Sequence, residues 1–325
     1  MTCFLGIDTS CYTTSLAVID QNTQLVAESR KLLHVPQGKR GLSQSEMVFQ
    51  HTRSFPILFA DICNTLSEPS FQALGVSACP RPVADSYMPA FLVGKGAAAV
   101  IALSQGIECY ELSHQENHIY AGLWSVGAQL SKQFLALHVS GGTTELVKVQ
   151  QIGAVLEITL LSATQDISAG QLIDRTGVKL SLPFPSGPSL EKCAALSQKH
   201  FKKGDYPVAF HSKTVSFSGP ETYLAKLIAS GEAAPDIALA VQLIVAETLS
   251  KMIQQAVIDT GLTEILLVGG VMSNQFIREF LVNSASQLKP ASKLFFAQQQ
   301  FSSDHAVGAA YFAYLKHHSQ FASIR

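Results

Sequence analysis

Two stretches of the sequence share one plan, and this repetition decides the fold. Residues 5–18 read LGIDTSCYTTSLAV, and residues 135–149 read LALHVSGGTTELVKV. Each begins as an apolar strand, passes through a turn of small residues and returns as a second strand that opens on two threonines. Such hairpins are common, so one alone would carry little weight. Because one stands at the head of each half of the chain, we expect two related lobes that face each other.

Around these hairpins, apolar segments alternate between helical and extended periodicity. Helices are expected at 43–66, 91–105, 113–128, 168–181, 187–200, 220–231, 236–260, 273–288 and 303–317, and strands at 72–78, 107–110, 264–268 and 293–297. This alternation predicts an α/β protein with mixed sheets. We expect an N-terminal lobe over 1–130 and a C-terminal lobe over 131–325, with the last helix returning to the first lobe.

The composition limits the classes of function. A chain of 325 residues exceeds the usual size of a single core, which favours two domains. Charged residues make up 14% and the net charge is -1, which excludes a polybasic chain that holds nucleic acid by its own charge. The apolar runs are too short for a membrane helix. Six scattered cysteines and the lack of a signal-peptide pattern predict a cytoplasmic protein.

Three turns of small residues follow apolar strands, at 8–11, 140–143 and 269–274. Glycine allows close approach of a ligand, and the backbone amides of such turns can cradle phosphate. The third turn leads directly into a helix, whose N-terminus favours an anion. This set of turns is typical of the actin, Hsp70 and sugar-kinase superfold, which holds a nucleotide between two lobes. Signatures of a P-loop or a dinucleotide fold are absent from the sequence.

His114 and His118 are spaced so that both imidazoles lie on one face of a helix and reach a single cation. Glu116 falls on the other side, unlike the glutamate of a zincin. Two surface histidines would give the same spacing, so the pattern alone leaves both interpretations open. Asp304, in the stretch SSDH at residues 302–305, is a candidate third ligand. Two imidazoles with a carboxylate suit Fe, Zn or Mn and leave positions open.

The motifs LGIDTSC, HQENH, VSGGTTELV, AGQLIDR, LPFPSGPSLEK, SFSGPET, VGGVMSN and SSDHA, in this order and spacing, resemble the TsaD and KEOPS catalytic subunit family, formerly called glycoproteases or O-sialoglycoprotein endopeptidases of peptidase family M22. The resemblance implies a two-lobed actin/Hsp70-like (ASKHA, duplicated RNase H-like) α/β fold with an interlobe nucleotide and metal site. It implies transfer of threonylcarbamoyl from its adenylate to N6 of adenosine 37 in tRNA.

The resemblance also implies cofactors, partners and site residues. One divalent metal (Fe, Zn or Mn, with Mg possible beside the nucleotide) and ATP or an adenylate would bind. The partners would be proteins of a tRNA-modification complex or a second copy of the chain, with tRNA held through them. The metal ligands carried over are His114, His118 and Asp304. The nucleotide or adenylate residues are Val139, Ser140, Gly141, Gly142, Asp174, Gly187, Glu191, Gly269, Gly270 and Asn274.

Within this site, Asp174 or Glu191 can accept hydrogen bonds from ribose hydroxyls, and Asn274 can pair with the base. His138 stands where archaeal relatives carry a tyrosine that reaches the metal. We therefore hypothesise that His138 is a third imidazole at the metal. A hydrogen-bonded histidine at the end of a strand is an equally open interpretation.

The sequence departs from the family where chemistry is expected. The family's first loop, TSCDET, reads TSCYTT here, so Tyr12 and Thr13 replace two acids, and Glu221 replaces the lysine of SFSGLKT. These changes favour a divergent paralogue, either an active transferase or a non-catalytic, regulatory protein that keeps metal and nucleotide binding. A metallopeptidase would need a base beside the histidines, and the sequence offers no compelling one. A small-molecule kinase would leave His114, His118 and Asp304 without a role.

Overall fold

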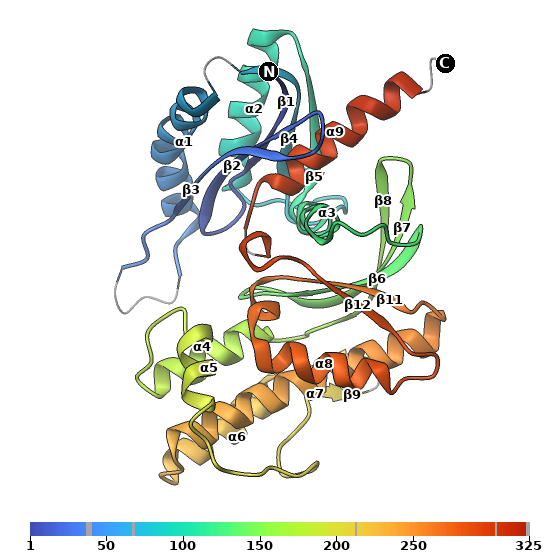
Figure 1. Ribbon diagram of the computed structural model, residues 1–325. Helices are drawn as coiled ribbons and strands as arrows, with labels where there is room; N and C mark the ends of the chain where they lie inside the picture. Colours follow the sequence, from blue (N-terminus) through green and yellow to red (C-terminus); the bar gives the residue numbers. More distant parts are fainter. Residues whose placement is uncertain (37–40, 67–68, 212, 303, 323–325) are drawn as a thin grey trace. The chain divides into compact units, whose positions relative to one another are not determined.

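The computed structural model describes residues 1–36, 41–66, 69–211, 213–302 and 304–322, which leaves Ser303 of the SSDHA motif outside the described residues. The chain divides into two compact units. Unit 1 comprises Met1–Ala128, Gln151–Leu156 and Gln300–Arg325, and unit 2 comprises Gln129–Gln150 and Glu157–Gln299. Each unit contains a five-stranded sheet with helices packed against it (Figure 1).

The sheet of unit 1 has the strand order β3-β2-β1-β4-β5. Its strands are β1 (Thr2–Asp8), β2 (Thr13–Asp20), β3 (Leu25–Leu32), β4 (Ser70–Cys79) and β5 (Glu108–Ser113), and its helices are α1 (Gln44–Leu66), α2 (Phe91–Gln105), α3 (His114–Val126) and α9 (Val307–Ala322). β1 is antiparallel to β2 and parallel to β4. Helices α1 and α2 pack on the face that carries Ile7 and Val76. Helix α9 packs on the opposite face, against β1 and β4.

Glycines allow α9 to lie directly on this sheet. A Cβ atom at Gly6 of β1 would overlap the carbonyl oxygen of Ala306, and one at Gly75 of β4 would overlap that of Ala309. Where α9 meets α3, a Cβ at Gly308 would overlap the carbonyl oxygen of Asn117. The backbone contact therefore brings the segment ahead of α9, with Asp304, beside α3.

Unit 2 repeats the strand order of unit 1, as β12-β11-β6-β7-β8. Its strands are β6 (Gln133–Val139), β7 (Thr144–Ile152), β8 (Val155–Ala163), β11 (Glu264–Val268) and β12 (Lys293–Phe296), and a separate two-stranded sheet joins β9 (Phe210–His211) and β10 (Thr214–Val215). The hairpins also share a register, since Ile7 pairs with Leu16 in unit 1 and Leu137 pairs with Leu146 in unit 2. The repeat predicted from the two hairpin stretches is confirmed in the fold.

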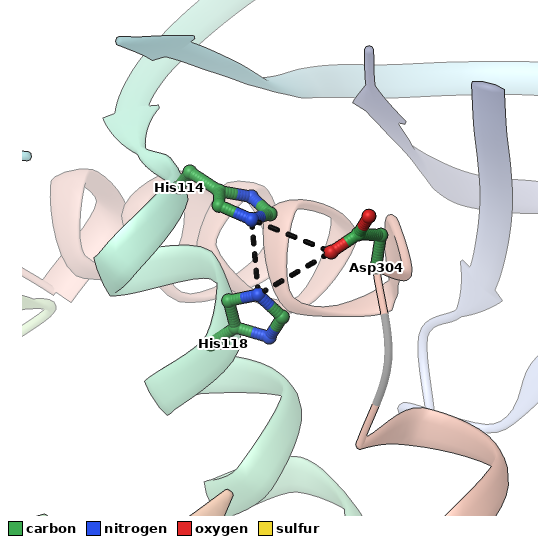
Figure 2. Close-up of side chains that lie close together, drawn as sticks. All are labelled: His114, His118 and Asp304. Carbon is green, nitrogen blue, oxygen red and sulfur yellow. Dashed lines mark hydrogen bonds and ion pairs between the residues drawn. The ribbon is translucent and has the colours of Figure 1, made fainter. Parts of the chain in front are cut away.

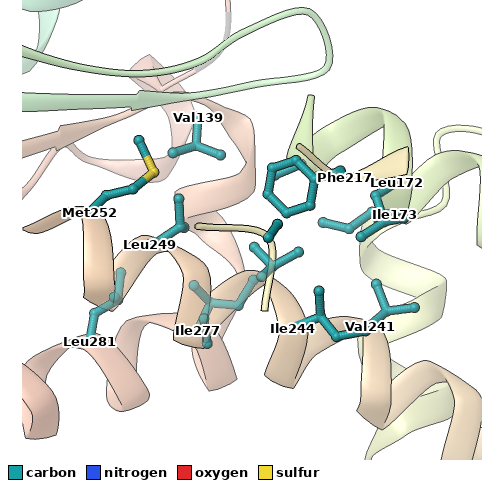
Figure 3. Close-up of a cluster of buried hydrophobic side chains, with 14 of the residues drawn as sticks. Val139, Leu172, Ile173, Phe217, Val241, Ile244, Leu249, Met252, Ile277 and Leu281 are labelled. Carbon is teal, nitrogen blue, oxygen red and sulfur yellow. The ribbon is translucent and has the colours of Figure 1, made fainter. Parts of the chain in front are cut away.

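Helix α7 forms the centre of the core of unit 2 (Figure 3). The helical elements of this unit are α4 (Ala169–Lys179), α5 (Gly187–Ala194), α6 (Ser218–Ala229), α7 (Ala234–Thr260), η1 (Gly270–Ser273) and α8 (Gln275–Ser286), and η2 (Gln299–Phe301) follows them. Val241, Ile244 and Leu249 of α7 are fully buried, in one cluster with Phe217 and Ile277. This packing supports α4 and α5, which carry Asp174, Gly187 and Glu191, and α8, which Asn274 precedes.

The expected elements are present, with differences at the sheet edges, in the short β9–β10 pair and at helix ends. The third strand of each sheet, β3 and β8, was not expected, because both are edge strands with many exposed side chains and no continuous apolar run. Helix α5 ends at Ala194 instead of 200, and α9 begins at Val307 instead of 303. In the described part of the chain, none of the helices combines the length and apolarity that a membrane span requires.

Candidate functional site

The start of α3 positions the two histidines of the HxxxH motif. Ser113 is the N-cap residue, and its hydroxyl oxygen accepts a hydrogen bond from the backbone amide of Glu116. The Glu116 carboxylate in turn accepts the amide of Ser113 at 2.7 Å, which completes a capping box. His114 therefore begins the helix and His118 follows one turn later. Glu116 is engaged in this cap, which weakens the interpretation of the chain as a metallopeptidase.

His114, His118 and Asp304 lie together in unit 1 and point toward one another (Figure 2). The two Nε2 atoms are 3.0 Å apart, and Oδ1 of Asp304 is 3.5 Å from Nε2 of His114 and 3.7 Å from that of His118. A point about 2 Å from all three atoms exists, which is the usual bond length from a divalent metal to imidazole or carboxylate. The three side chains therefore fit a single ion with positions left for other ligands.

A buried carboxylate, Asp8, faces the second nitrogen of His114. Oδ2 of Asp8 lies 3.4 Å from Nδ1 of His114, and the Asp8 side chain is 0% exposed. Burial opposes the imidazolium of His114, but the charge of Asp8 and contacts with Asp304 outweigh it and raise the pKa of His114 well above its usual value. Burial alone would raise the pKa of Asp8, but His114 and Ser10 lower it. The site therefore favours positive charge, as a proton or as a cation.

The first loop, where the family's two acids are replaced, is tied to the helices of unit 1. The imidazole of His51 in α1 contacts the Thr14 hydroxyl at 2.8 Å and the Cys11 carbonyl at 3.2 Å. The Thr9 hydroxyl donates to the carbonyl of Ala90 just ahead of α2. Tyr12 is exposed, and its carbonyl accepts the amide of Leu33. The loop is thus held in place without a carboxylate at positions 12 and 13.

In unit 2, the predicted phosphate loop lies against the start of α4. The Ser140 hydroxyl oxygen accepts the amides of Gly142 at 3.3 Å and Thr143 at 3.1 Å. The N-cap residue of α4, Ser168, donates its hydroxyl to the carbonyl of Gly141. Gly141 and Gly142 are exposed, and added Cβ atoms there would meet nothing within 4 Å. An exposed loop beside a helix N-terminus suits an anionic ligand.

Other predicted nucleotide residues stabilise the connections around this loop. Gly269 has a φ of 99° and lies against the carbonyl of Val139, so a side chain there would be strained and would clash. Next to it in sequence, Gly270 begins η1 and has open space around it. Asp174 accepts the amide of Ser186 at 2.7 Å. Burial is the largest influence on its carboxyl group, and it raises the pKa of Asp174.

The remaining residues join α5 to α8. Gly187 begins α5, and Glu191 of the same helix accepts the amide of Gln275 at 2.6 Å. Asn274 caps α8 by accepting the amide of Ile277 at 2.9 Å. The carbonyl and carboxyl oxygens expected to meet a ribose or base thus have hydrogen bonds within unit 2. Their roles in nucleotide binding stay predictions.

His138 is the penultimate residue of β6 in unit 2. Its Nδ1 atom is 3.9 Å from Oε1 of Glu145, its partner across the β6–β7 hairpin. The side chain is buried. Its assignment as an additional metal ligand stays a prediction.

Two contacts of buried or hydrogen-bonded acids were not found from the sequence. One is the contact of Asp8 with His114, whose only signal is an acid directly after an apolar strand. The other is Asp166, whose carboxylate accepts hydrogen bonds from the Ser216 hydroxyl at 2.6 Å and the Phe217 amide at 2.9 Å. Burial alone would raise the pKa of Asp166. The hydrogen bonds from Ser216, Phe217 and Ser218 outweigh burial and lower this pKa to about 2. Asp166 thereby anchors the start of α6.

The charge reversal at Glu221 is compensated within unit 2. Glu221 in α6 lies 3.2 Å from Nη1 of Arg175 and 3.8 Å from Nζ of Lys179, both in α4. The substitution therefore gives an ion pair between two helices. Partly exposed pairs of this kind add little to stability.

Comparison with known proteins shows one family and one fold. The family described as TsaD, tRNA N6-adenosine threonylcarbamoyltransferase, matches residues 87–311, more than half of the chain. A Clostridium difficile activator of 2-hydroxyisocaproyl-CoA dehydratase, solved with ADPNP, has a TM-score of 0.54 at 10% identity, with 99% of this chain and 98% of that one covered.

Two further solved structures are similar. A Streptomyces griseus ROK-family glucokinase, solved with glucose and AMPPNP, has a TM-score of 0.55 at 12% identity over 96% of this chain and 99% of that one. HypF of T. kodakarensis has a TM-score of 0.61 at 12% identity, over 98% of this chain but 48% of its own. At these identities the likeness concerns the fold alone. The expected ASKHA-type α/β fold is confirmed.

Proposed function

The chain belongs to the TsaD family of tRNA N6-adenosine threonylcarbamoyltransferases, and from this premise we propose that it binds one divalent metal and an adenylate and transfers threonylcarbamoyl to N6 of a tRNA adenosine. The observation that carries the proposal is the cluster of His114, His118 and Asp304. The family match supports the substrate class, and the cluster supports retention of a working site in a sequence that departs from the family elsewhere.

His114, His118 and Asp304 would hold the metal through two imidazole nitrogens and one carboxylate oxygen. This donor set suits Fe, Zn or Mn, and Mg would be expected only with nucleotide phosphates. A bound divalent ion supplies a Lewis acid that polarises phosphate or carbamoyl oxygens. The protein residues keep the ligand atoms in a fixed triangle, so little reorganisation is needed when the ion binds.

The adenylate would be held by residues of unit 2. The exposed Ser140–Gly142 loop and the start of α4 offer backbone amides to phosphate. Asp174 and Glu191 would accept ribose hydroxyls. Since Oδ1 of Asn274 is bonded to Ile277, we expect its amide nitrogen to donate to the base. Two of the similar structures carry ATP analogues, which supports nucleotide binding in this fold.

A second candidate is a non-catalytic or regulatory paralogue that keeps both ligands. It is favoured by Tyr12 and Thr13, which leave the first loop without its acidic pair. The acid that remains in this segment, Asp8, is fully buried against His114 and is not placed to replace them.

One assay separates these two functions. The purified chain is added to partner proteins that lack their own synthase subunit, and modified adenosine in tRNA is measured by mass spectrometry. Metal content and ATP binding are measured on the same preparation. Product that is lost in His118→Ala supports the transferase. No product from a chain that binds both ligands, under conditions where a family enzyme works, supports the regulatory paralogue.

We also propose that another protein surface covers helix α2. Leu92, Val100 and Leu103 are 51%, 68% and 84% exposed on this helix, at spacings that place them along one side. A net charge of -1 provides little attraction for tRNA, so a basic partner would supply it. Such a complex would act in the cytoplasm. The molar mass of the purified chain in solution distinguishes a homodimer from a monomer that awaits a different partner.

A further inference from the structure

We infer that Asp8 is the positioning residue of the metal site, and that its carboxylate holds His114 with Nδ1 toward Asp8 and Nε2 toward the ion. The inference rests on the metal site of the proposed function and deepens it. It assigns a task to an acid that is not among the predicted metal or nucleotide residues. It also explains why a carboxylate is completely buried at the end of β1.

The two nitrogens of His114 face different partners. Nε2 is 3.0 Å from Nε2 of His118 and 3.5 Å from Oδ1 of Asp304, whereas Nδ1 is 3.4 Å from Oδ2 of Asp8. A nitrogen that faces a carboxylate carries the proton, so the lone pair of the neutral ring is on the other nitrogen. Carboxylates commonly orient metal-binding histidines in this way. At 3.4 Å the imidazole nitrogen and the carboxylate oxygen are in close contact.

Asp8 is itself held in place by the backbone and by α3. Its Oδ1 atom accepts the amide of Ser10 at 2.9 Å, and its Oδ2 atom accepts Nδ2 of Asn117 at 3.0 Å. The Asn117 amide also donates to the carbonyl of His305, the residue after Asp304. One amide group therefore connects Asp8 to the segment that carries the third ligand. Asp8 and Asn117 together align the first loop, α3 and the start of α9.

The cost of burying Asp8 supports the same assignment. An ionised carboxylate away from water is strongly unfavourable unless hydrogen bonds and positive charge compensate it. Asn117 and Ser10 supply neutral donors, and the facing ring of His114 is the group that can transmit positive charge from a bound ion. An asparagine has a single acceptor oxygen, so it would lose one of the two hydrogen bonds that Asp8 accepts from Ser10 and Asn117. The oxygen that accepts from Asn117 also faces His114, so the carboxylate lies where it can orient the ring.

The test compares metal affinity in Asp8→Asn and Asp8→Glu with the wild-type chain, using Co²⁺ and Zn²⁺ alone. Asp20→Asn is the matched control, because Asp20 caps the turn at the other end of the β1–β2 hairpin by accepting the amides of Asn22 and Gln24 at 2.8 Å. Loss of a carboxylate behind a metal-binding histidine weakens affinity about 10- to 100-fold. We expect this loss in Asp8→Asn, partial recovery in Asp8→Glu, and no change in Asp20→Asn.

A measurement on the wild-type protein keeps the inference testable if Asp8→Asn fails to fold. In the zinc-loaded chain with ¹⁵N-labelled histidine, NMR should show His114 protonated at Nδ1 and bound to zinc through Nε2. Zinc on Nδ1 would overturn the inference, as would a folded Asp8→Asn variant with unchanged affinity. Neither result depends on tRNA modification. A chain that binds zinc as expected but makes no product would contradict only the transferase.

Discussion

The β1–β2 hairpin of unit 1 and the β6–β7 hairpin of unit 2 have the same register but different side chains at the turn. Asp8 pairs with Ser15 at the end of the first hairpin, and His138 pairs with Glu145 at the matching position of the second. Ser10 and Cys11 in the first turn are buried and half-buried, whereas the matching Ser140 and Gly141 in the second are half-buried and exposed. One backbone frame thus supports a buried site suited to a cation in unit 1 and an open amide loop suited to an anion in unit 2.

The sheets also differ in how closely a helix can approach. Gly6 and Gly75 are paired neighbours on β1 and β4, and both contact the backbone of α9. At the matching pair in unit 2, Ala136 lies beside Leu266. The glycine pair is therefore the feature of unit 1 that admits α9 and brings Asp304 to the histidines.

The largest effect should come from Gly75→Ala. The new Cβ would overlap the backbone of Ala309, which cannot rotate away, so α9 must shift. We expect a loss of about 3 kcal/mol in the free energy of unfolding, as for severe overpacking, together with loss of high-affinity metal binding because Asp304 moves. Urea unfolding and Zn²⁺ titration measure the two effects. If this variant were as stable as the wild type, the glycine pair would not be what allows α9 to approach the sheet of unit 1.

A second test concerns the matching positions Asp8 and His138. If His138 is an additional ligand, His138→Ala should lower metal affinity about tenfold. The exposed His211 provides the control, since His211→Ala should leave the affinity unchanged. Metal content and affinity equal to wild type in His138→Ala would restrict the metal site to residues of unit 1.

A third test uses the difference between the anchoring acids of the two units. Asp8 faces a histidine, whereas Asp166 in unit 2 accepts hydrogen bonds from neutral groups. These bonds lower the pKa of Asp166 to about 2. Their contribution to the free energy of unfolding is therefore fully present at a pH above the ordinary pKa of an aspartate, and it is lost as the pH falls through about 2.

Asp166→Asn should therefore cost about 1 kcal/mol near neutral pH, allowing for the exposure of this group to solvent. The difference from wild type should shrink as the pH falls from 4 toward 2, which urea midpoints measure. Glu157→Gln, at an exposed position of the same unit, should show no such trend. A deficit in Asp166→Asn that persists below pH 2 would contradict the role of the carboxylate charge.

The smallest effect on stability should come from Gly141→Ala. An added Cβ there meets nothing within 4 Å, so the free energy of unfolding should change by less than about 0.5 kcal/mol. ATP affinity should nevertheless fall several-fold, because the methyl group would occupy the side from which phosphate approaches the amides. Calorimetric titration with ATP checks this. Unchanged ATP affinity would show that the loop is not the phosphate site.

Some of these features follow from the sequence alone. The repeated hairpins, the αβ alternation and the position of α2 follow from local periodicity and turn residues, which act over a few neighbours. The spacing of His114 and His118 likewise depends only on helix geometry. The edge strands β3 and β8 cannot be predicted in this way, because their exposed side chains show little apolar pattern.

The tertiary structure decided which distant residues meet. Asp304 reaches the histidines because glycines in strands far apart in sequence let α9 lie on the sheet, and Asp8 reaches His114 because β1 and β5 end at the same edge. Neither contact has a local signal, since a glycine or an aspartate after a strand has many uses. The sequence determined the types of the predicted ligands and the frame, whereas nonlocal backbone packing brought His114, His118 and Asp304 close enough for one ion to contact all three.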